Sequence, residues 1–353
     1  MKIVIFTKYS SLAASSRLRT YQYLPYFKAQ GYDFEIYPLF DGHYLTNYYK
    51  KGNKSKLSII TQYVKRICLL KKMINADVVI IEKELFPWLP YIFESFMALF
   101  KIKYIVDYDD AIFHNYDQNG KVICFFLSTK INSVMKNSAA CICGNTYLQN
   151  KAVLSGAGFT KVIPTVIDIN RYDKKNYYTI EHKIKVGWIG SPSTAVYLNE
   201  ISDVLKILAK RYDFTLVIVG AEFECEGVNV ECHAWSEDNE VNLIKSFDVG
   251  IMPLKDSPWE KGKCGYKLIQ YMACAVPVIG SDIGVNREII NNSNSGYVVN
   301  GNESWINAFE SLFKSKELRQ KLGGNGREAV IEKYTVQSQA KEYIDILNRI
   351  RSS

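Results

Sequence analysis

The sequence predicts an α/β protein made of two Rossmann-like, doubly wound domains in tandem, each with a parallel sheet covered by helices. The chain has 353 residues, which is enough for two average domains. Short apolar runs alternate with helical patterns in residues 1–172, and a second alternation of the same kind begins at Lys185. The segment between them, residues 173–184, is polar and has no clear period, so we predict that it is a linker.

The N-terminal domain, residues 1–172, is predicted to contain five buried strands before its last apolar run, 162–172. These strands are expected at Lys2–Phe6, Phe34–Leu39, Asp77–Ile81, Tyr104–Asp110 and Ala139–Cys143. Helical spacing of apolar residues falls between them, at 17–30, 57–74, 90–100 and 123–135. A further helix is expected after Asn145, a residue type that often caps helices.

The C-terminal domain, residues 185–334, repeats this alternation. Its strands are expected at Lys185–Gly190, Phe214–Gly220, Val228–Cys232, Asp248–Leu254 and Val278–Gly280. A helix is predicted at 197–211, and residues 335–353 are predicted to form a last helix capped by Thr335. Because ligands of open α/β sheets bind beyond the carboxyl ends of the strands, we expect the site in a cleft between two facing sheets.

Composition excludes several other classes of protein. A hydrophobic content of 48% and a charged content of 23% are typical of a globular protein with a large core. The apolar stretch Leu89–Phe100 is too short to span a bilayer, and we expect no signal peptide, which together favour a cytoplasmic location. The eight cysteines form no C-x-x-C pair and only four histidines are present, so we expect reduced cysteines and no metal site.

The net charge of +8 is unevenly distributed. Residues 42–76 contain no acid and eight basic residues, which are Lys50, Lys51, Lys54, Lys56, Lys65, Arg66, Lys71 and Lys72. Basic residues mixed with aromatic and aliphatic ones suit an anionic membrane surface, which would place the protein peripherally on the inner face of the cytoplasmic membrane. The alternative is a solvated helix face. No recognised nucleic-acid motif accompanies the charge, so we do not expect nucleic acid as a partner.

A stretch from Trp259 to Ile290 has the features of a phosphate site. A loop with glycines and lysines precedes a short predicted helix, 266–274. Backbone N–H groups at a helix N-terminus, left accessible by glycine and flanked by lysines, favour binding of a phosphate. The alternative is an ordinary turn of the same composition.

Four segments together resemble a known family. They are KVGWIGSPST (185–194), VIPTVID (162–168), DVGIMPL (248–254) and KLIQYMACAVPVIGSDIG (267–284). They are similar to the glycosyltransferases of family 4, the glycosyl transferases group 1, which have the GT-B fold. The resemblance runs nearly end to end and is strongest in the second half, where MACAVPVIGS is its most specific part.

The resemblance implies a nucleotide-diphosphate sugar as donor, UDP- or GDP-linked, bound by the C-terminal domain, and an acceptor bound by the N-terminal domain. It further implies transfer with retention of the anomeric configuration, no metal and no separate cofactor, and a C-terminal helix that crosses back to the first domain. The sequence also departs from the family, which often has two glutamates eight positions apart. Those positions are Gly262 and Gln270 here, so a different group has to contact the transferred sugar, and Glu260 and Lys263 lie close enough to do so.

Several donor-site residues follow from the loop and the resemblance. Lys263 and Lys267, with the N–H groups of Cys264 and Gly265, are predicted to hold the diphosphate and stabilise the charge that develops on the leaving group. We assign Lys267 a catalytic role for this reason.

Four more residues are assigned to donor binding from their position. Gly190 and Ser191 end the first strand of the second domain, where glycine permits close approach of the backbone to a ligand, although a tight turn is the alternative. Gln270 is expected to hydrogen-bond ribose hydroxyls. Glu288 corresponds by resemblance to an acidic residue near the ribose or donor sugar, although a first-turn helix carboxylate is the alternative.

The N-terminal domain offers candidates for acceptor chemistry. Asp109 and Asp110 follow a buried strand and are predicted catalytic residues that orient or deprotonate an acceptor hydroxyl, with a loop cap as the alternative. Ser15, Ser16 and Arg17 follow the first strand and are expected to touch the donor phosphates or the acceptor, with a helix-surface position as the alternative for Arg17. Trp235 could stack on the nucleotide base, although burial in the core is the commoner fate of a tryptophan.

These observations predict a retaining, metal-independent glycosyltransferase acting on a glycan or polyprenyl-linked acceptor in bacterial surface polysaccharide synthesis. One alternative is a nucleotide-sugar epimerase of the same fold, which would need several carboxylates and a histidine around the sugar. The other is a nucleotide-sugar-binding protein that has lost catalysis. Product formation distinguishes the three.

Overall fold

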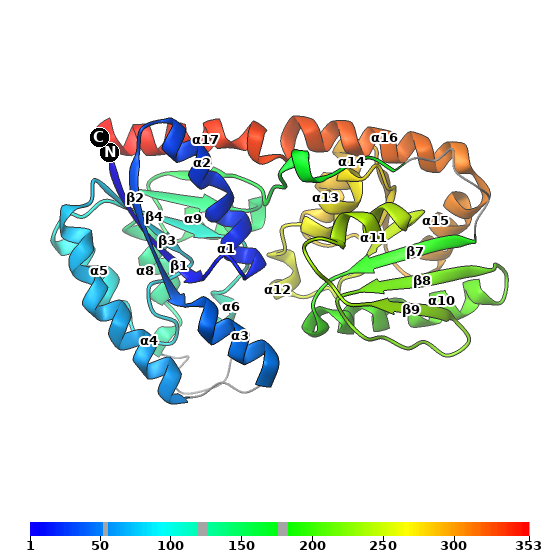
Figure 1. Cartoon of the computed structure of the whole chain (residues 1–353), viewed down its shortest axis with the longest axis horizontal. Helices are drawn as coiled ribbons and strands as arrows, with labels where there is room; N and C mark the ends of the chain where they lie inside the picture. Colours follow the sequence, from blue (N-terminus) through cyan, green and yellow to red (C-terminus); the bar gives the residue numbers. More distant parts are fainter. Residues whose placement is uncertain (52–55, 119–125, 176–182, 353) are drawn as a thin grey trace. The chain divides into compact units, whose positions relative to one another are not determined.

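The computed structural model describes residues 1–51, 56–118, 126–175 and 183–352 (Figure 1). Contacts divide the chain into two compact units. The first comprises Met1–Thr165 together with Gln339–Ser353, and the second comprises Val166–Ser338. Each unit has a six-stranded parallel sheet with helices, which confirms the predicted α/β class.

The sheet of the first unit has the strand order β2-β1-β3-β4-β5-β6, with every neighbouring pair parallel. Its strands are β1 Lys2–Tyr9, β2 Asp33–Phe40, β3 Val78–Glu82, β4 Tyr104–Tyr108, β5 Ala140–Cys143 and β6 Thr160–Val162. Central strands β3, β4 and β5 are buried along their whole length, which explains why the sequence shows continuous apolar runs there.

Helices and 3-10 turns connect these strands. They are α1 Ala14–Arg19, η1 Tyr21–Tyr23, α2 Leu24–Ala29, α3 Gly42–Lys51, α4 Lys56–Leu69, η2 Leu70–Asn75, α5 Ile92–Leu99, α6 His114–Asp117, α8 Lys130–Lys136 and α9 Thr146–Leu154. The predicted helix at 17–30 is therefore three short elements, and Pro25 lies in the first turn of the last of them. The predicted helix at 123–135 lies partly outside the described residues. The predicted cap is confirmed, because Asn145 Oδ1 accepts a hydrogen bond from the Leu148 amide at 2.9 Å.

The last helix, α17 Val336–Ser352, begins as predicted, because the Ser338 amide donates to Thr335 Oγ1 at 3.0 Å. From Gln339 onward it belongs to the first unit. The Tyr343 ring packs against the rings of Tyr23 and Phe27, at centroid distances of 5.1 and 5.3 Å. This packing explains why apolar residues recur at helical spacing at the end of the chain.

The sheet of the second unit has the order β12-β11-β10-β7-β8-β9 and is parallel throughout. Its strands are β7 Ile184–Ile189, β8 Phe214–Val219, β9 Asn229–His233, β10 Val249–Met252, β11 Val278–Ser281 and β12 Gly296–Val299. The chain starts in the middle at β7, builds outward through β8 and β9, and then returns to the other side of β7 at β10. The point where the strand order reverses, between β7 and β10, is where open α/β sheets bind ligands.

Helices lie on both faces of this second sheet (Figure 1). They are η4 Pro192–Ile201, α10 Ser202–Ala209, α11 Glu240–Ser246, α12 Pro258–Lys261, α13 Tyr266–Ala273, α14 Asn286–Ser293, α15 Asn302–Lys314 and α16 Lys316–Lys333. The predicted helix at 197–211 is instead a 3-10 segment followed by the shorter α10. Strand β12 was not predicted, because its four residues are only partly buried and show no strong apolar run.

The change from the first unit to the second falls earlier than the predicted boundary after Tyr172. Ile167 and Tyr172 are 1% and 3% exposed and lie in the apolar core of the second unit. Lys175 Nζ donates to Phe247 O and Asp248 Oδ1 at 2.6 and 2.7 Å, so the start of the predicted linker is also anchored there. Most of the remaining linker, 176–182, lies outside the described residues.

Two other features bear on the expectations from composition. No helix within the described ranges has both the length and the apolar character needed to cross a membrane. Seven cysteines fall in the described part of the chain, and all are free thiols that are buried, except Cys68 and Cys232.

Candidate functional site

In the second unit, the carboxyl ends of β7, β8 and β9 meet in tightly packed turns. Gly220, at a φ of +88°, follows β8, and a Cβ there would lie 2.5 Å from Gly190 O and 3.2 Å from Trp235 Cβ. A Cβ on Gly190 would lie 2.6 Å from a ring carbon of Trp188. Glycine is therefore required at both turns, and Trp235 lies beside the Gly220 turn, which itself packs against Gly190.

Ser191 and Gly190 lie where the sequence analysis placed them, directly after β7. Ser191 is exposed and precedes η4, and its hydroxyl lies 3.0 Å from that of Ser193. Ser191 and Ser193 thus place two hydroxyl groups beyond the carboxyl end of β7, next to the point between β7 and β10 where the strand order reverses.

The N-terminus of α13 is where the sequence predicted a phosphate site. Gly265 is its cap residue, at a φ of +67°, and has no side chain to cover the first N–H groups of the helix. A Cβ on Gly265 would lie 2.3 Å from Ile289 Cδ1, so the helix start is packed closely against α14. The positive end of the helix dipole favours an anion at this position.

Two lysines flank this helix start, as predicted. Lys267 Nζ lies 5.2 Å from the centroid of the Trp188 ring, and Lys263 Nζ lies 5.4 Å from that of Trp259. Each ammonium group is therefore held over an aromatic face rather than free in solvent. The thiol of Cys264 is buried, so only its backbone is suited to contact a ligand.

Gln270 is part of a buried hydrogen-bond relay that the sequence did not reveal. Its Nε2 donates to the Tyr172 hydroxyl at 3.1 Å, and that hydroxyl donates to Glu240 Oε1 at 2.6 Å. Trp235 Nε1 donates to Glu240 Oε2 at 2.7 Å. Burial, reinforced by the neighbouring Tyr266 and by Glu240, raises the pKa of the Tyr172 phenol well above its usual value, so the phenol stays a donor.

This relay changes two expectations. The Gln270 side chain is 3% exposed, and its amide is already engaged within the protein. Trp235 is not a core residue, because 41% of it is exposed while its indole N–H is fixed by a buried carboxylate. The relay therefore links helix α13 to an exposed, oriented indole ring.

Glu260, considered as a replacement for the glutamate missing at Gly262, is occupied by neighbouring hydroxyls. It is 7% exposed, its Oε1 accepts from Tyr197 at 2.6 Å, and its Oε2 accepts from Ser257. Those contacts fix the short helix α12. Lys263, the other candidate, lies over the Trp259 ring.

Glu288 is exposed and lies in the first turn of α14. Burial together with the Glu288 charge raises the pKa of Tyr334 to about 12. The position fits both of the roles considered for it, a ligand contact and a carboxylate favoured by the helix dipole.

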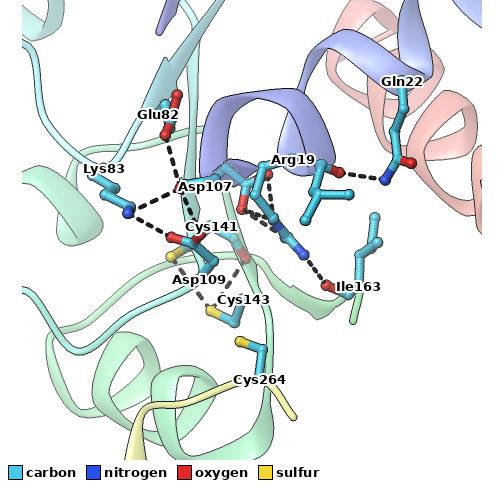
Figure 2. A network of polar contacts seen from close by, with 12 residues as sticks. Arg19, Gln22, Glu82, Lys83, Asp107, Asp109, Cys141, Cys143, Ile163 and Cys264 are labelled. Atoms are coloured by element: carbon cyan, nitrogen blue, oxygen red, sulfur yellow. Dashed lines mark hydrogen bonds and ion pairs between the residues drawn. The ribbon is translucent and has the colours of Figure 1, made fainter. Parts of the chain in front are cut away.

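In the first unit, a polar network lies at the carboxyl ends of β3 and β4 and the start of α1 (Figure 2). Lys83 Nζ is 2.8 Å from Asp109 Oδ1 and donates to Ser15 Oγ at 3.1 Å. Ser15 donates to Asp109 Oδ2 at 2.6 Å and its Oγ also lies 3.1 Å from Glu82 Oε1, and Ser16 donates to Glu82 Oε2 at 2.6 Å. The predicted residue Asp109 is therefore close to Ser15, which was also a candidate, and to Lys83, which was not.

Charges in this network are strongly coupled. Burial disfavours the Lys83 charge, but Asp109 and Asp110 outweigh it and raise the pKa of the ammonium group. Burial would likewise raise the pKa of Asp109, yet Lys83 and the Ser15 hydroxyl lower it. Asp109 is thus held ionised and is a weak base, whereas Asp110 is more exposed, at 26%, and lies 3.9 Å from Lys83.

Lys83 has a backbone φ of +66°, a conformation that L-residues rarely adopt. Its amide donates to Asp107 O at 2.9 Å, which holds this conformation. Strained residues cluster at functional sites. The backbone conformation of Lys83 and its buried ammonium group therefore both mark this residue as a candidate functional residue.

Three other polar residues near this edge have partners within the protein. Arg19 pairs with Asp107 at 2.6 Å and donates to Ile163 O at 2.7 Å, all within the core. Arg17 is half-buried, and its Nη1 donates to Ser11 O at 3.4 Å. Both ring nitrogens of His114 have partners, Asp117 at 2.8 Å and Tyr147 at 2.9 Å.

The described ranges contain no cluster of three or more histidine, cysteine or acidic side chains arranged to hold a metal ion. The positively charged side chains described above at the start of α13 are those of Lys263 and Lys267.

Comparison with known proteins agrees with this geometry. Residues 173–329 match the family model described as glycosyl transferases group 1. The chain is 28% identical to N-acetyl-alpha-D-glucosaminyl L-malate synthase of Bacillus anthracis over 41% of each chain. It is 23% identical to the capsular polysaccharide biosynthesis glycosyltransferase CapM of Staphylococcus aureus, over 61% of this chain and 60% of that one. The chain spans less than two thirds of the length of these relatives.

Solved structures share the whole architecture. Sucrose-phosphate synthase of Thermosynechococcus elongatus superposes with a TM-score of 0.75 at 13% identity, covering 100% of this chain and 99% of that one. Anabaena Alr3699/HepE, solved in complex with UDP-glucose, gives 0.72 at 14% identity, covering 99% and 100%. The fold is therefore the one these structures share, the GT-B fold that the resemblance implied, and residues 173–329 are similar to the glycosyl transferases group 1.

Proposed function

We propose that the protein is a glycosyltransferase that moves a sugar from a nucleotide-diphosphate sugar to a glycan or polyprenyl-linked acceptor in bacterial surface polysaccharide synthesis. The observation that carries this proposal is the anion site at the start of α13, with Gly265 at its cap and Lys267 beside it. It lies in the region that is similar to the glycosyl transferases group 1, and structural neighbours such as HepE were solved with UDP and UDP-glucose.

In this proposal the diphosphate binds at the N-terminus of α13. As the glycosidic bond breaks, negative charge grows on the leaving nucleoside diphosphate. Helix N–H groups, Lys263 and Lys267 are preorganised to stabilise that charge more than they stabilise the ground state. These fixed cations would do the work of a metal ion, which is the basis for proposing a metal-independent reaction.

The nucleobase would lie next to the turns of Gly190 and Gly220, where Trp235 is exposed. An indole ring fixed by Glu240 loses little freedom when a base stacks on it. Gln270 would act through this relay and through its carbonyl oxygen, rather than through the amide group used by Tyr172. Glu288 and Ser191 remain proposed contacts to donor hydroxyls or phosphate.

Acceptor chemistry would fall to the network of the first unit. Asp109 is too strongly ion-paired to take a proton readily, so we propose that it positions Lys83 and Ser15. Asp110, less buried and less tightly paired, is the better candidate to accept a hydrogen bond from an acceptor hydroxyl. We propose retention of configuration at the anomeric carbon because the resemblance to the family implies it. The configuration of the product's new glycosidic bond tests this proposal.

Product analysis tests this function. Purified protein would be incubated with radiolabelled UDP-glucose or GDP-mannose and a panel of monosaccharide and polyprenyl-diphosphate-linked acceptors, and the products separated. We expect label in a larger product, release of the nucleoside diphosphate, and an α-linkage from these α-linked donors. A new epimer of the nucleotide sugar would indicate the isomerase instead, and binding without any product would indicate a protein that has lost catalysis.

A further inference from the structure

The loop between β3 and α5, residues 83–91, has an unusual backbone. Within the described ranges, five residues other than glycine have a positive φ. Three of them lie at or just after helix ends, where left-handed residues are common, and these are Lys101, Ala275 and Asn294. The other two are Lys83 and Trp88, at +66° and +62°, and both belong to this loop. Strain that no helix end explains marks the loop as a candidate functional segment.

Every residue from Lys83 to Trp88 is anchored by a hydrogen bond to another element of the first unit. The partners lie on β4, α4, α5, α6 and α8, and they are Asp107 for Lys83, Tyr116 and Lys130 for Glu84, Glu94 for Leu85, Lys130 for Phe86, Tyr63 for Pro87 and Tyr116 for Trp88. Residues 83–87 are all buried, whereas Trp88 is 43% exposed. The loop is therefore a rigid support that reaches the surface at Trp88.

A buried ion pair holds the backbone of Trp88. Lys130 and Glu84 form this pair and are 3% and 5% exposed. Both carboxylate oxygens of Glu84 accept from the Tyr116 hydroxyl at 2.9 Å, and that hydroxyl accepts from the Trp88 amide at 3.1 Å. Burial, together with the Glu84 charge, raises the pKa of the Tyr116 phenol, so it stays protonated and continues to donate to Glu84. A pair that is costly to bury thus fixes the one exposed residue of segment 83–88.

Arg66 of α4 fixes the same loop to the centre of the sheet. It was predicted to lie on a basic surface, but it is 1% exposed, and its guanidinium group donates to Thr7 O, Tyr37 O and Leu85 O at 2.5, 2.8 and 3.4 Å. A single buried cation therefore connects β1, β2 and the loop. The side chains of residues 47–55, which include three more lysines of the predicted surface, lie outside the described part of the structure.

The Trp88 ring is fixed but accessible. Its centroid lies 5.2 Å from that of the Tyr116 ring at an interplanar angle of 67°, which is an edge-to-face contact. Because 43% of the residue is exposed, part of the indole surface is open to a ligand. An aromatic side chain that is already ordered loses little conformational entropy when a ligand stacks on it.

The loop begins at the ligand-binding edge of the first sheet. The strand order β2-β1-β3 reverses between β1 and β3, and open α/β sheets bind ligands beyond the carboxyl ends of strands at such a point. Lys83, the first residue after β3, belongs to the polar network around Asp109 (Figure 2). The polar network and the exposed indole of Trp88 are therefore the two ends of one rigid segment.

We propose that Trp88 is the surface on which a sugar ring of the acceptor stacks, so that the acceptor ends in a pyranose rather than in a polyprenyl phosphate. This inference rests on the proposed function, which assigns the acceptor to the first unit. A pyranose has an apolar C–H face, which suits an indole ring, and hydroxyl groups, which suit carboxylates such as Asp110. A polyprenyl phosphate has no ring to stack and is the poorer fit.

Saturation-transfer NMR on the full chain tests this stacking. The probes are the methyl α-pyranosides of glucose, galactose, mannose and N-acetylglucosamine, with farnesyl phosphate as the lipid phosphate. We expect at least one methyl pyranoside to bind and Trp88→Gly to weaken that binding about two- to tenfold. Glycine adopts a positive φ freely, so the loop should keep its conformation without the ring. Trp88→Phe keeps an aromatic face and should retain most of the binding.

The matched control is Phe96→Ala. Phe96 is an aromatic residue of the same unit that is 49% exposed but lies on α5, beyond the loop. This control should bind the methyl pyranosides like the wild type. Melting temperatures close to that of the wild type would show that all three variants fold.

The proposal is wrong if the wild type binds none of the methyl pyranosides, or if Trp88→Gly loses no more binding than Phe96→Ala. It is also wrong if farnesyl phosphate is the probe whose binding depends on Trp88. Titration with UDP and GDP on the same samples separates this inference from the proposed function. Pyranoside binding that depends on Trp88, without any nucleotide binding, contradicts only the proposed donor site, and the converse contradicts only the role of Trp88.

Discussion

Replacing Lys267 by methionine removes one charge from the predicted diphosphate site while keeping the length of the side chain. Lys267 Nζ lies 5.2 Å from the Trp188 ring centroid, directly after the first residue of α13. A hydrogen bond to a charged group contributes about 1.5–3 kcal/mol. With 1.4 kcal/mol per factor of ten, Lys267→Met should weaken nucleoside-diphosphate binding about ten- to a hundredfold.

Stability should change much less than binding. A cation–π contact at a partly exposed site contributes about 0.5–1 kcal/mol, and methionine keeps most of the packing on Trp188. Isothermal titration with UDP and GDP measures the affinity, and urea unfolding measures the stability. Lys316→Ala, which removes an exposed lysine of the same unit on α16, is the control and should change neither quantity. Affinity of the wild-type value in Lys267→Met, with the nucleotide still bound to the second unit, would refute the assignment of the diphosphate site.

Three further predictions follow from the geometry. Trp235→Ala should weaken nucleotide binding by about 1–3 kcal/mol if a base stacks on the ring, and titration should show nucleosides losing as much as nucleoside diphosphates; equal binding in mutant and wild type would contradict this. Asp109→Asn should cost about 3–5 kcal/mol in urea unfolding because it removes the closest carboxylate from the buried Lys83, whereas Asp110→Asn should cost under about 1 kcal/mol. Since the folded pKa of Asp109 lies below the unfolded value near 3.9, its stabilisation is present at neutral pH and is lost as the pH falls below about 4, so Asp109→Asn should flatten the acid limb of the stability curve. Gly265→Ala should destabilise the protein by about 1–2 kcal/mol because of the positive φ, and a thermal melt that is unchanged would contradict the need for glycine there.

The sequence was sufficient for the features that depend on local pattern. Buried parallel strands such as β3 and β4 show continuous apolar runs because both faces of the sheet are covered. The start of α13 was predictable because a glycine at the cap and flanking lysines are close together in the chain. The end of the chain was predictable from its apolar stripe and from Thr335 as cap.

Features that depend on contacts between distant residues were not predictable. Nothing near Lys83 indicates that it takes a positive φ and pairs with Asp109, which lies on a different strand loop. Arg66 was assigned to a basic surface, but it is buried because backbone carbonyl groups from β1 and β2 need a donor there. Trp235 donates to the buried Glu240, and Glu240 also accepts from Tyr172, which lies more than sixty positions earlier in the chain. The sequence gives no sign of this network.

The unit boundary was also a long-range property. Residues 166–172 look like the end of the first alternation, yet Ile167 and Tyr172 pack into the core of the second unit. Their apolar character predicted burial correctly but could not tell which core would bury them.

Thermal-shift screening against nucleotides tests the central claim most directly. Purified protein would be melted alone and with a panel of nucleoside diphosphates and their sugars, once with magnesium and once with a chelator. A ligand that binds only the folded state raises the melting midpoint. The account predicts a rise with one nucleoside diphosphate and its sugars, equal in magnesium and chelator, and a smaller rise in Lys267→Met. No rise with any member of the panel, or a rise that requires magnesium, would contradict it.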